Sequence, residues 1–255
     1  MSPLGISKTV LLGEITRATR VHHGRDGRVR ALLSLTTRLL PVGIHGDSSG
    51  SLLTDAHLVY CEGSLAKQVA HLGCGALVYV EGKNREQRWS DAGGKNHHLS
   101  FVSASVIRLL SNTAAAEGVN TVTLIGTVTS EPSVRYTAEQ QCESVGLRIM
   151  TTHGAPAESA DSPKYHSEYH DVTFVGLLAR RVFSEAHEAS LVFVEGRNQL
   201  SHCQDGEQAH HRSITIVGQE FQLLHTHPVH ARPPERNLEV MYGYDVQLPE
   251  EALVG

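Results

Sequence analysis

Alternation of apolar and polar residues predicts β-strands over most of the chain. In one early stretch Val29, Ala31, Leu33 and Leu35 fall on one face, and Arg30 falls on the other. Side chains of a strand point alternately to its two faces, so the apolar set faces a core and the cations face solvent. Such stretches are separated by loops rich in Gly, Ser, Pro and Asp, which is typical of an antiparallel all-β protein.

The expected elements occur twice in the same order. Each half contains two strands, a polar loop, a third strand, one short helix, a long fourth strand, a hairpin loop and a fifth strand. In the first strand the apolar positions are Val10 and Leu12, and in its repeat they are Val122 and Leu124. The later elements of the first half are strand 28–38, loop 43–55, strand 57–62, helix 64–71, strand 76–85 and strand 99–109. Those of the second half are strand 145–149, loop 154–167, strand 169–175, helix 177–187, strand 190–199 and strand 213–224.

The residues repeat as well as the elements. Thr-Val-Leu-Leu-Gly-Glu-Ile-Thr at 9–16 returns as Val-Thr-Leu-Ile-Gly-Thr-Val-Thr at 122–129, at a spacing of 113 residues. Two further blocks, which begin at Val59 and Leu77, return at spacings of 113 and 114 residues. These spacings are far longer than those of solenoid repeats, so the matched blocks indicate a duplicated domain.

Five strands with a helix between the third and fourth is the order of the OB-fold barrel, whose open face and long loops bind oligonucleotides. We therefore predict an all-β protein with two tandem five-stranded OB-fold barrels, each carrying one short helix. The expected domains are 1–111 and 119–225, joined by a linker at 112–118. Residues 226–255 contain four prolines and are expected to form an extended, flexible tail.

Length and composition limit the number of domains and the cellular compartment in which the protein is expected. The 255 residues fit two domains of about 110 residues each. The N-terminus lacks the pattern of a secretory signal, and no apolar run approaches the ~18 residues of a membrane span, so a cytoplasmic protein with no membrane contact is expected. The cysteines lie far apart and are expected to be reduced thiols: Cys61, Cys74, Cys142 and Cys203.

The net charge of −5 hides an asymmetry between the halves. Residues 1–111 hold 13 Lys and Arg against 8 Asp and Glu, whereas residues 112–225 hold 7 against 14. A polyanion is therefore expected to be drawn mainly to the first half. The acidic second half is expected to supply an assembly surface, some DNA contact, or both.

Three segments resemble bacterial single-stranded DNA-binding proteins. Residues 120–126 (Asn-Thr-Val-Thr-Leu-Ile-Gly) with 131–136 (Glu-Pro-Ser-Val-Arg-Tyr) resemble the opening of that family, and 168–179 resemble its third strand and helix start. Residues 78–91 resemble its fourth strand and the loop that bears a stacking tryptophan. The resemblance covers most of 8–224. The tandem arrangement is similar to members with two OB domains per chain that dimerise to reach four, so a homodimer is expected.

The chain departs from the family pattern at several aromatic positions. Tyr169 stands at the third-strand stacking position of the second repeat, but the first repeat has Ala56 there. Glu62 and Val175 stand where phenylalanine is usual before the strand-end glycine, and only Trp89 keeps its place. The acidic tail with an apolar tip, through which the family recruits repair and replication proteins, is also missing. The departures imply weaker DNA binding.

A single strand is held by cations along its phosphates and by aromatic faces under its bases. On the fourth strand of the first repeat, regular alternation places Tyr79, Lys83, Arg85 and Trp89 on one face. The other candidates of this repeat are Arg88 and Lys95 beside the tryptophan, Arg28, Arg30 and Arg38 on the second strand, Arg17 and Arg20 at the lip of the groove, and Tyr60 on the third strand. The second repeat adds Tyr169, Arg148 and Arg197.

Several of these candidates have an alternative role. An exposed tryptophan can sit in an interface, although the cations beside Trp89 favour base stacking. Tyr79 either packs between subunits or touches DNA, and Tyr60 and Tyr169 either stack on bases or serve the surface alone. Scattered arginines are often only solvated, yet their concentration in the first repeat favours DNA binding for the set.

Seventeen histidines raise the question of a metal. Adjacent histidines such as His22 and His23 face opposite ways on a strand, and no carboxylate or thiolate completes a set around His225 and His227. No metal and no cofactor are therefore expected. Histidines in loops would instead add positive charge beside DNA near pH 6. Motifs of enzymes are also absent, because the chain has no Walker loop, GxSxG or HExxH.

The sequence therefore predicts sequence-independent binding of single-stranded DNA in replication, recombination, repair or mobile-element transfer. Replication or recombination proteins are possible partners. The alternative is an OB-fold adaptor of a replication or mobile-element complex with weak DNA contact, which the missing aromatics and the acidic second half would explain.

Overall fold

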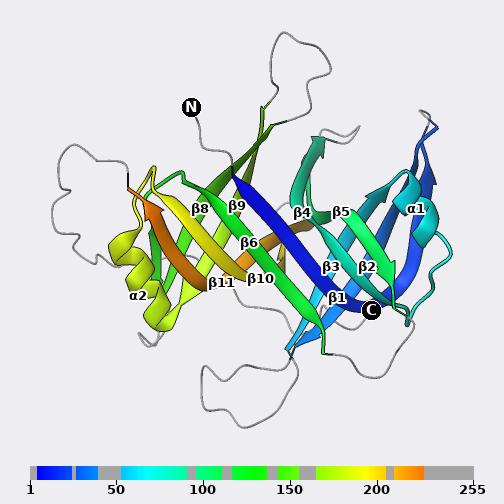
Figure 1. Ribbon diagram of the computed structural model, residues 1–255, viewed down its shortest axis with the longest axis horizontal. Coiled ribbons are helices and arrows are strands. Elements are labelled where there is room, and N and C mark those ends of the chain that lie inside the picture. Colours follow the sequence, from blue (N-terminus) through cyan, green and yellow to red (C-terminus); the bar gives the residue numbers. More distant parts are fainter. Residues whose placement is uncertain are drawn as a thin grey trace.

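The computed structural model describes residues 5–24, 27–39, 53–90, 96–110, 117–136, 143–154, 165–204 and 210–226. Within these ranges the chain forms one continuous antiparallel and parallel sheet that closes into two barrels (Figure 1). The two short helices lie at opposite ends of the molecule. No helix of the described residues is long and apolar enough to cross a membrane.

The first barrel is built from five strands. They are β1 (Ile6–His23), β2 (Val29–Leu39), β3 (Leu53–Glu62), β4 (Leu77–Ser90) and β5 (Asn96–Leu109), with α1 (Ser64–Val69) between β3 and β4. The strand order β2-β3-β5-β4-β1 closes through the pairing of β1 with β2, and β3 pairs with β5 in parallel. This is the order predicted for an OB-fold.

The second barrel repeats this plan with one addition. Its elements are β6 (Val119–Val128), β7 (Ser133–Tyr136), β8 (Glu143–Gly154), β9 (Tyr165–Val175), α2 (Gly176–Glu185), β10 (Leu191–Gln204) and β11 (His210–His225). The long β1 of the first barrel corresponds to two strands here, β6 and β7, and both pair with β8. The prediction of two tandem barrels, each with one helix, is confirmed.

An approximate twofold axis relates the barrels. β1 and β6 pair antiparallel from Ile6 opposite Ile125 to Leu12 opposite Val119. Thr9 pairs with Val122, its own equivalent at the 113-residue spacing, so the axis passes between these two residues. The same bulge also occurs twice, after Glu81 in β4 and after Glu195 in β10. The duplication has thus produced an isologous contact within one chain.

Each barrel has its own apolar core. Leu11, Leu33 and Val80 belong to the first, and Leu124 and Phe174 belong to the second. Cys61 is also in the first core, where burial raises the pKa of its thiol to about 12 and keeps it protonated at neutral pH. Its position agrees with the expected reduced thiol.

A glycine is required where each barrel closes. A Cβ built on Gly13 would lie 2.4 Å from the carbonyl oxygen of Thr36, and one built on Gly126 would lie 2.5 Å from that of Met150. Real Cβ atoms do not approach a backbone oxygen this closely, so only glycine lets the first strand cross the second. This explains the glycine shared by the first matched blocks.

The structure corrects several sequence predictions. In β1 the buried residues are Ser7, Thr9, Leu11, Gly13 and Ile15, so Val10 and Leu12 face outward, opposite to the prediction. The run Val10-Leu11-Leu12 is apolar throughout, and alternation could not decide its face. The polar loops end earlier than predicted, because β3 begins at Leu53 and β9 at Tyr165. The expected tail lies outside the described residues, apart from its first residue, 226, as does most of the expected linker.

Candidate nucleic-acid interface

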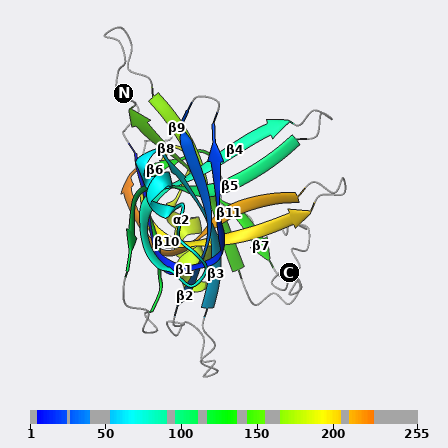
Figure 2. The same ribbon diagram turned by 90° about the vertical axis from the view of Figure 1, so that its right-hand side faces the viewer.

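A groove of about 670 Å³ lies between the two barrels. One wall is the end of β4 with residues of β5, and the other is formed by β8, β9 and β11. Figure 2 shows β4 and β5 extending as a paired arm beyond the body of the molecule. The groove is therefore shared by the two halves of the chain and does not belong to the basic half alone, as the charge distribution had suggested.

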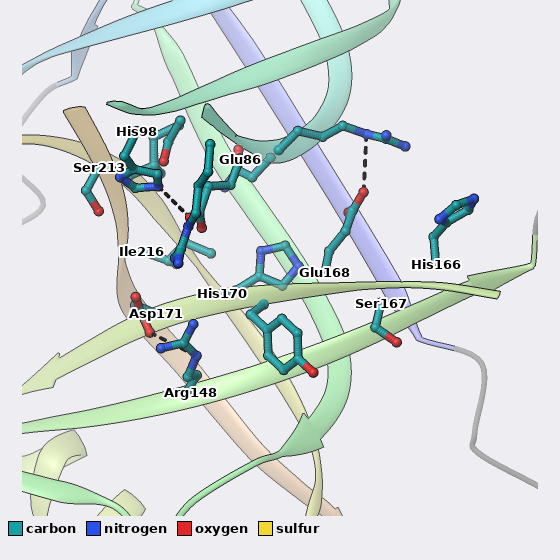
Figure 3. A pocket seen from close by; sticks show the side chains of 16 residues that line it. Glu86, His98, Arg148, His166, Ser167, Glu168, His170, Asp171, Ser213 and Ile216 are labelled. Atoms are coloured by element: carbon teal, nitrogen blue, oxygen red, sulfur yellow. Dashed lines mark hydrogen bonds and ion pairs between the residues drawn. The ribbon is translucent and has the colours of Figure 1, made fainter. Parts of the chain in front are cut away.

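Three arginines line the groove, and each is paired with a carboxylate. Arg85 of β4 reaches across to Glu168 of β9 at 3.2 Å, Arg148 of β8 lies 4.0 Å from Asp171, and Arg88 pairs with Glu86 (Figure 3). The arginines remain about half exposed or more, at 52%, 48% and 71% for Arg85, Arg148 and Arg88. The pair of Arg148 with Asp171 is exposed on both sides and contributes little stability, about 0–1 kcal/mol, so a phosphate can replace that carboxylate at small cost, whereas Glu168 is only 14% exposed.

An aromatic ring stands on the second-barrel wall. Tyr169 is 50% exposed, and the guanidinium carbon of Arg148 lies 5.4 Å from the centre of its ring. This cation–π contact holds the ring from one side. A half-exposed ring among cations is the arrangement on which an unpaired base stacks.

A second aromatic cluster continues the groove onto the first barrel. Phe101 of β5 is the cross-strand partner of Arg85, and its ring centre lies 5.5 Å from that of Tyr60 on β3. Cross-strand partners share a face of the sheet, so Tyr60, Phe101 and Arg85 form one surface track. Sequence reasoning missed Phe101, although comparison of the repeats could have found it, because Thr215 stands at the equivalent position.

A buried polar network joins the barrels beneath the groove. Asn84 of β4 and Asn198 of β10 are equivalent residues, and each amide nitrogen donates to the other's oxygen, at 2.6 and 2.8 Å. Thr9 donates a third hydrogen bond to Asn84 at 3.0 Å. Reciprocal bonding of this kind satisfies polar groups that burial would otherwise penalise, and it fixes how the two barrels meet.

Arg197 is part of this network. One terminal nitrogen of Arg197 lies 2.8 Å from each carboxylate oxygen of Asp55, whose other donor is Asn120 at 3.0 Å. The side chains of Arg197 and Asp55 are only 13% and 5% exposed. We therefore correct the prediction for Arg197, because a cation buried against its own carboxylate is not offered to a nucleic acid.

Two equivalent histidines are buried, one in each barrel, and of the two only His170 lines the groove. His57 bonds to Thr37 and His170 bonds to Thr151, each at 3.0 Å. Burial lowers the pKa of both imidazoles to about 4, with a smaller effect of Arg197 on His57 and of His153 on His170. Both are thus neutral at physiological pH. They provide structure and do not supply the pH-dependent charge expected of histidines beside DNA.

The cations predicted on the first two strands lie away from this groove. Arg17 and Arg20 are exposed on β1, and none of the five described arginines of β1 and β2 and the turn between them lines the groove. Three of them contact carboxylates of the first barrel, as Arg28 and Arg30 do with Glu62 and Arg38 does with Glu14. They form a separate basic surface.

The remaining predicted residues lie on or near β4. Trp89 belongs to β4 opposite His97, and its side chain is outside the described part of the structure, as is Lys95. Lys83 is half-buried opposite Ser103, on the same face as Arg85. The hydroxyl of Tyr79 donates to Glu81 at 2.6 Å on the outer face of the sheet, and Tyr79 does not line the groove.

The described residues contain no group of three or more His, Cys, Asp or Glu placed to hold a metal ion. What the groove offers is a set of exposed guanidinium groups, one exposed ring and a neighbouring aromatic pair. This chemistry suits a flexible polyanion with planar bases.

Comparison with known proteins agrees with this interpretation. Residues 119–224 match the model of the single-strand binding protein family. Wild-type single-stranded DNA binding protein from Thermus aquaticus superposes with a TM-score of 0.68 at 19% identity, covering 90% of this chain and 98% of that one. A deletion mutant of the same protein gives 0.67 at 20%, covering 91% and 99%. The two-barrel fold is thus shared over nearly the whole chain, and the second barrel is similar to the single-strand binding protein family.

Proposed function

We propose that this protein binds single-stranded DNA without reading its base sequence. It acts by binding and not by catalysis, and it shelters transient single strands in replication, recombination, repair or mobile-element transfer. The observation that carries the proposal is the inter-barrel groove, where Arg85, Arg88 and Arg148 line the same cavity as the half-exposed ring of Tyr169. The family match of the second barrel supports it independently.

The proposed path of the strand follows the aromatic groups. Bases stack on Tyr169 in the second barrel and on the Tyr60–Phe101 pair in the first, and phosphates contact Arg148 and Arg85 between them. The contacts come from ring faces and guanidinium groups, which accept any base, so no sequence preference is expected.

Fluorescence anisotropy with labelled poly(dT) tests the proposal. The full chain should raise the anisotropy at low salt, and the effect should weaken as salt rises because cations on the protein displace counterions from the phosphates. A labelled duplex of the same length is the control and should bind more weakly. Trp89 is the only tryptophan, so quenching of its emission would report on the β4–β5 arm. Absence of binding at low salt would contradict the proposal and leave the adaptor role.

We further propose that two chains associate through the outer face of β4, β1, β6 and β10. Because alternate residues of these strands fill the cores, the others point outward, and several are apolar or aromatic: Val10, Leu12, Tyr79, Ile125 and Phe193. Both helices lie at the ends of the molecule, away from this face (Figure 1). A second copy related by a twofold axis would cover it and bring four barrels together.

Light scattering tests this assembly. The full chain should scatter as twice the 27.7 kDa of one chain. Leu12→Glu with Phe193→Glu should return it to a single chain, with the circular dichroism of the folded protein retained. A single-chain mass for the unmodified protein at micromolar concentration would refute the proposed dimer but would not contradict the proposed DNA binding.

A further inference from the structure

The approximate twofold axis gives the chain two equivalent inter-barrel junctions. The open junction is the groove between the β4–β5 arm of the first barrel and β8–β9 of the second. Its counterpart, the closed junction, lies where β10 of the second barrel meets β3 of the first, at Arg197 and Asp55. The register of every strand pair around the two junctions agrees at spacings of 113 or 114 residues, so their residues can be compared one by one.

Five residues that suit a nucleic acid lie in or beside the open junction. Arg85, Arg148 and Tyr169 line its groove, and Tyr60 and Phe101 lie next to Arg85 on the first barrel, outside the lining of the groove. The equivalents at the closed junction carry neither a ring nor a positive charge. They are, in the same order, Gln199, Ser34, Ala56, Thr173 and Thr215.

The buried acids of the two junctions also differ in how they are satisfied. At the closed junction, Asp55 accepts hydrogen bonds from Arg197 and Asn120. The equivalent of Asn120 is Ser7, which is too short to reach Glu168, the equivalent of Asp55. One carboxylate oxygen of Glu168 and the hydroxyl of Ser7 are therefore buried without a hydrogen-bond partner.

The ion pairs that span the junctions also differ, and their arginines stand at different positions, because the equivalent of Arg197 is Lys83 and that of Arg85 is Gln199. Arg197 is 13% exposed, and one of its nitrogens lies 2.8 Å from both oxygens of Asp55. Arg85 is 52% exposed and touches Glu168 at 3.2 Å. The first pair fills its junction and holds the barrels together, whereas the second leaves a cation facing an open groove.

We propose that the duplicated chain has kept one junction as its nucleic-acid site and converted the other into a structural lock. The proposal deepens the proposed function and rests on it. Each chain therefore has one strong site for a short single strand, although it contains two OB folds. Because the site takes one wall from each barrel, neither barrel alone completes it.

Native mass spectrometry with a short oligothymidylate counts the sites. An oligomer of about 10 nucleotides is suitable, because one OB fold covers ~4–16 nucleotides. The full chain at low salt should bind one oligomer per chain with high affinity. Two sites of equal affinity per chain would overturn the proposal, since the closed junction would then be a working site.

Exchanging residues between the junctions tests the location. Arg85→Gln with Tyr169→Ala gives the open junction the residues of the closed one, and should weaken binding of the oligomer by about 5- to 150-fold through the lost base stack and cation. Ala56→Tyr with Gln199→Arg makes the reciprocal change at the closed junction. It should leave both the affinity and the count of one per chain unchanged, because the Asp55–Arg197 pair still closes that junction.

The outcomes separate this inference from the proposed function. If the unmodified chain binds no single-stranded DNA, the proposed function fails. If it binds but the Arg85→Gln, Tyr169→Ala variant has unchanged affinity, or if the reciprocal variant gains a second site, only the one-junction inference fails. Thermal unfolding of each variant checks that the fold is retained, and the count on the unmodified chain does not depend on any variant.

Discussion

At the scale of single residues, Glu168 decides how much positive charge the groove presents. Its carboxylate holds Arg85, and its second oxygen has no hydrogen-bond partner. A bound phosphate shares this guanidinium group with the carboxylate or displaces it. Glu168 therefore competes with DNA for Arg85.

Replacing this carboxylate should strengthen DNA binding. Glu168→Gln frees Arg85 and removes one negative charge from the path of the strand, so we expect poly(dT) to bind about two- to fivefold more tightly at low salt, the equivalent of ~0.5–1 kcal/mol for an exposed ion pair. Anisotropy titration measures the change. Glu185→Gln on α2 removes a more exposed charge, paired with Arg181 and away from the groove, and serves as the control. Weaker binding by Glu168→Gln would show that the acid supports the site.

Arg197 illustrates the opposite case, a cation whose partner is buried. Arg197→Met leaves the carboxylate of Asp55 inside the junction with only Asn120 as donor. Breaking one side of a buried pair costs about 3–5 kcal/mol, so urea unfolding should show a loss of that size. Arg181→Met, which breaks an exposed pair on α2, should cost less than about 1 kcal/mol.

The sequence could identify these residue types but not their surroundings. Arg85 and Arg197 are cations two positions apart in the repeat of the fourth strand, yet one faces a groove and the other is buried. The difference comes from partners 83 and 142 residues away in the chain, Glu168 and Asp55, which only the folded junction brings near. Phe101 was missed for the same reason, since only the folded chain brings it beside Tyr60 and Arg85.

At the scale of strands and helices, prediction succeeded where each strand has one face in a core. Strand β2 follows its predicted alternation throughout, because only one of its faces is buried. Strand β1 does not, because Val10, Leu11 and Leu12 are all apolar and the outward pair lies on the central sheet. The helices were predicted within a few residues of their true ends.

Two buried Thr–His hydrogen bonds, one in each barrel, make the stability of the fold depend on pH. His57 and His170 have a pKa of about 4 when folded, against 6.5 when exposed, so the unfolded chain takes up protons first as the pH falls. The contribution of the two neutral histidines to the free energy of unfolding is fully present above about pH 6.5 and is lost as the pH falls toward 4. Lowering the pH from 7 to 5 should therefore reduce the free energy of unfolding by about 2 kcal/mol for each histidine.

Urea unfolding at pH 7 and pH 5 measures this loss. His57→Gln should reduce the difference between the two pH values by about 2 kcal/mol, because glutamine cannot take up the proton. His71→Gln, in the exposed turn after α1, should leave the difference as it is. An unchanged difference in His57→Gln would mean that other groups govern acid unfolding.

At the scale of the whole molecule, the fold brings cations together in a way that the charge of each half does not reveal. The first half is basic and the second acidic, which led us to expect a positive groove on the first barrel. In the structure, the five described arginines of the β1–β2 region lie apart from the groove, which takes Arg85 and Arg88 from one half and Arg148 from the other. Net charge describes the approach of a polyanion, whereas the groove determines where it is held.

Salt dependence distinguishes these two basic surfaces. Each phosphate contact on a single strand contributes about 0.7 to the slope of log K against log salt. Replacing Arg85, Arg88 and Arg148 with Gln should therefore reduce the slope for poly(dT) by about 2. The same replacement of Arg17, Arg20 and Arg38 removes as much charge from the β1–β2 region and should change the affinity slightly and the slope very little. If only this second variant has a smaller slope of log K against log salt, the DNA strand binds on the first barrel, as its charge had suggested. The groove between the barrels would then not be the DNA-binding site.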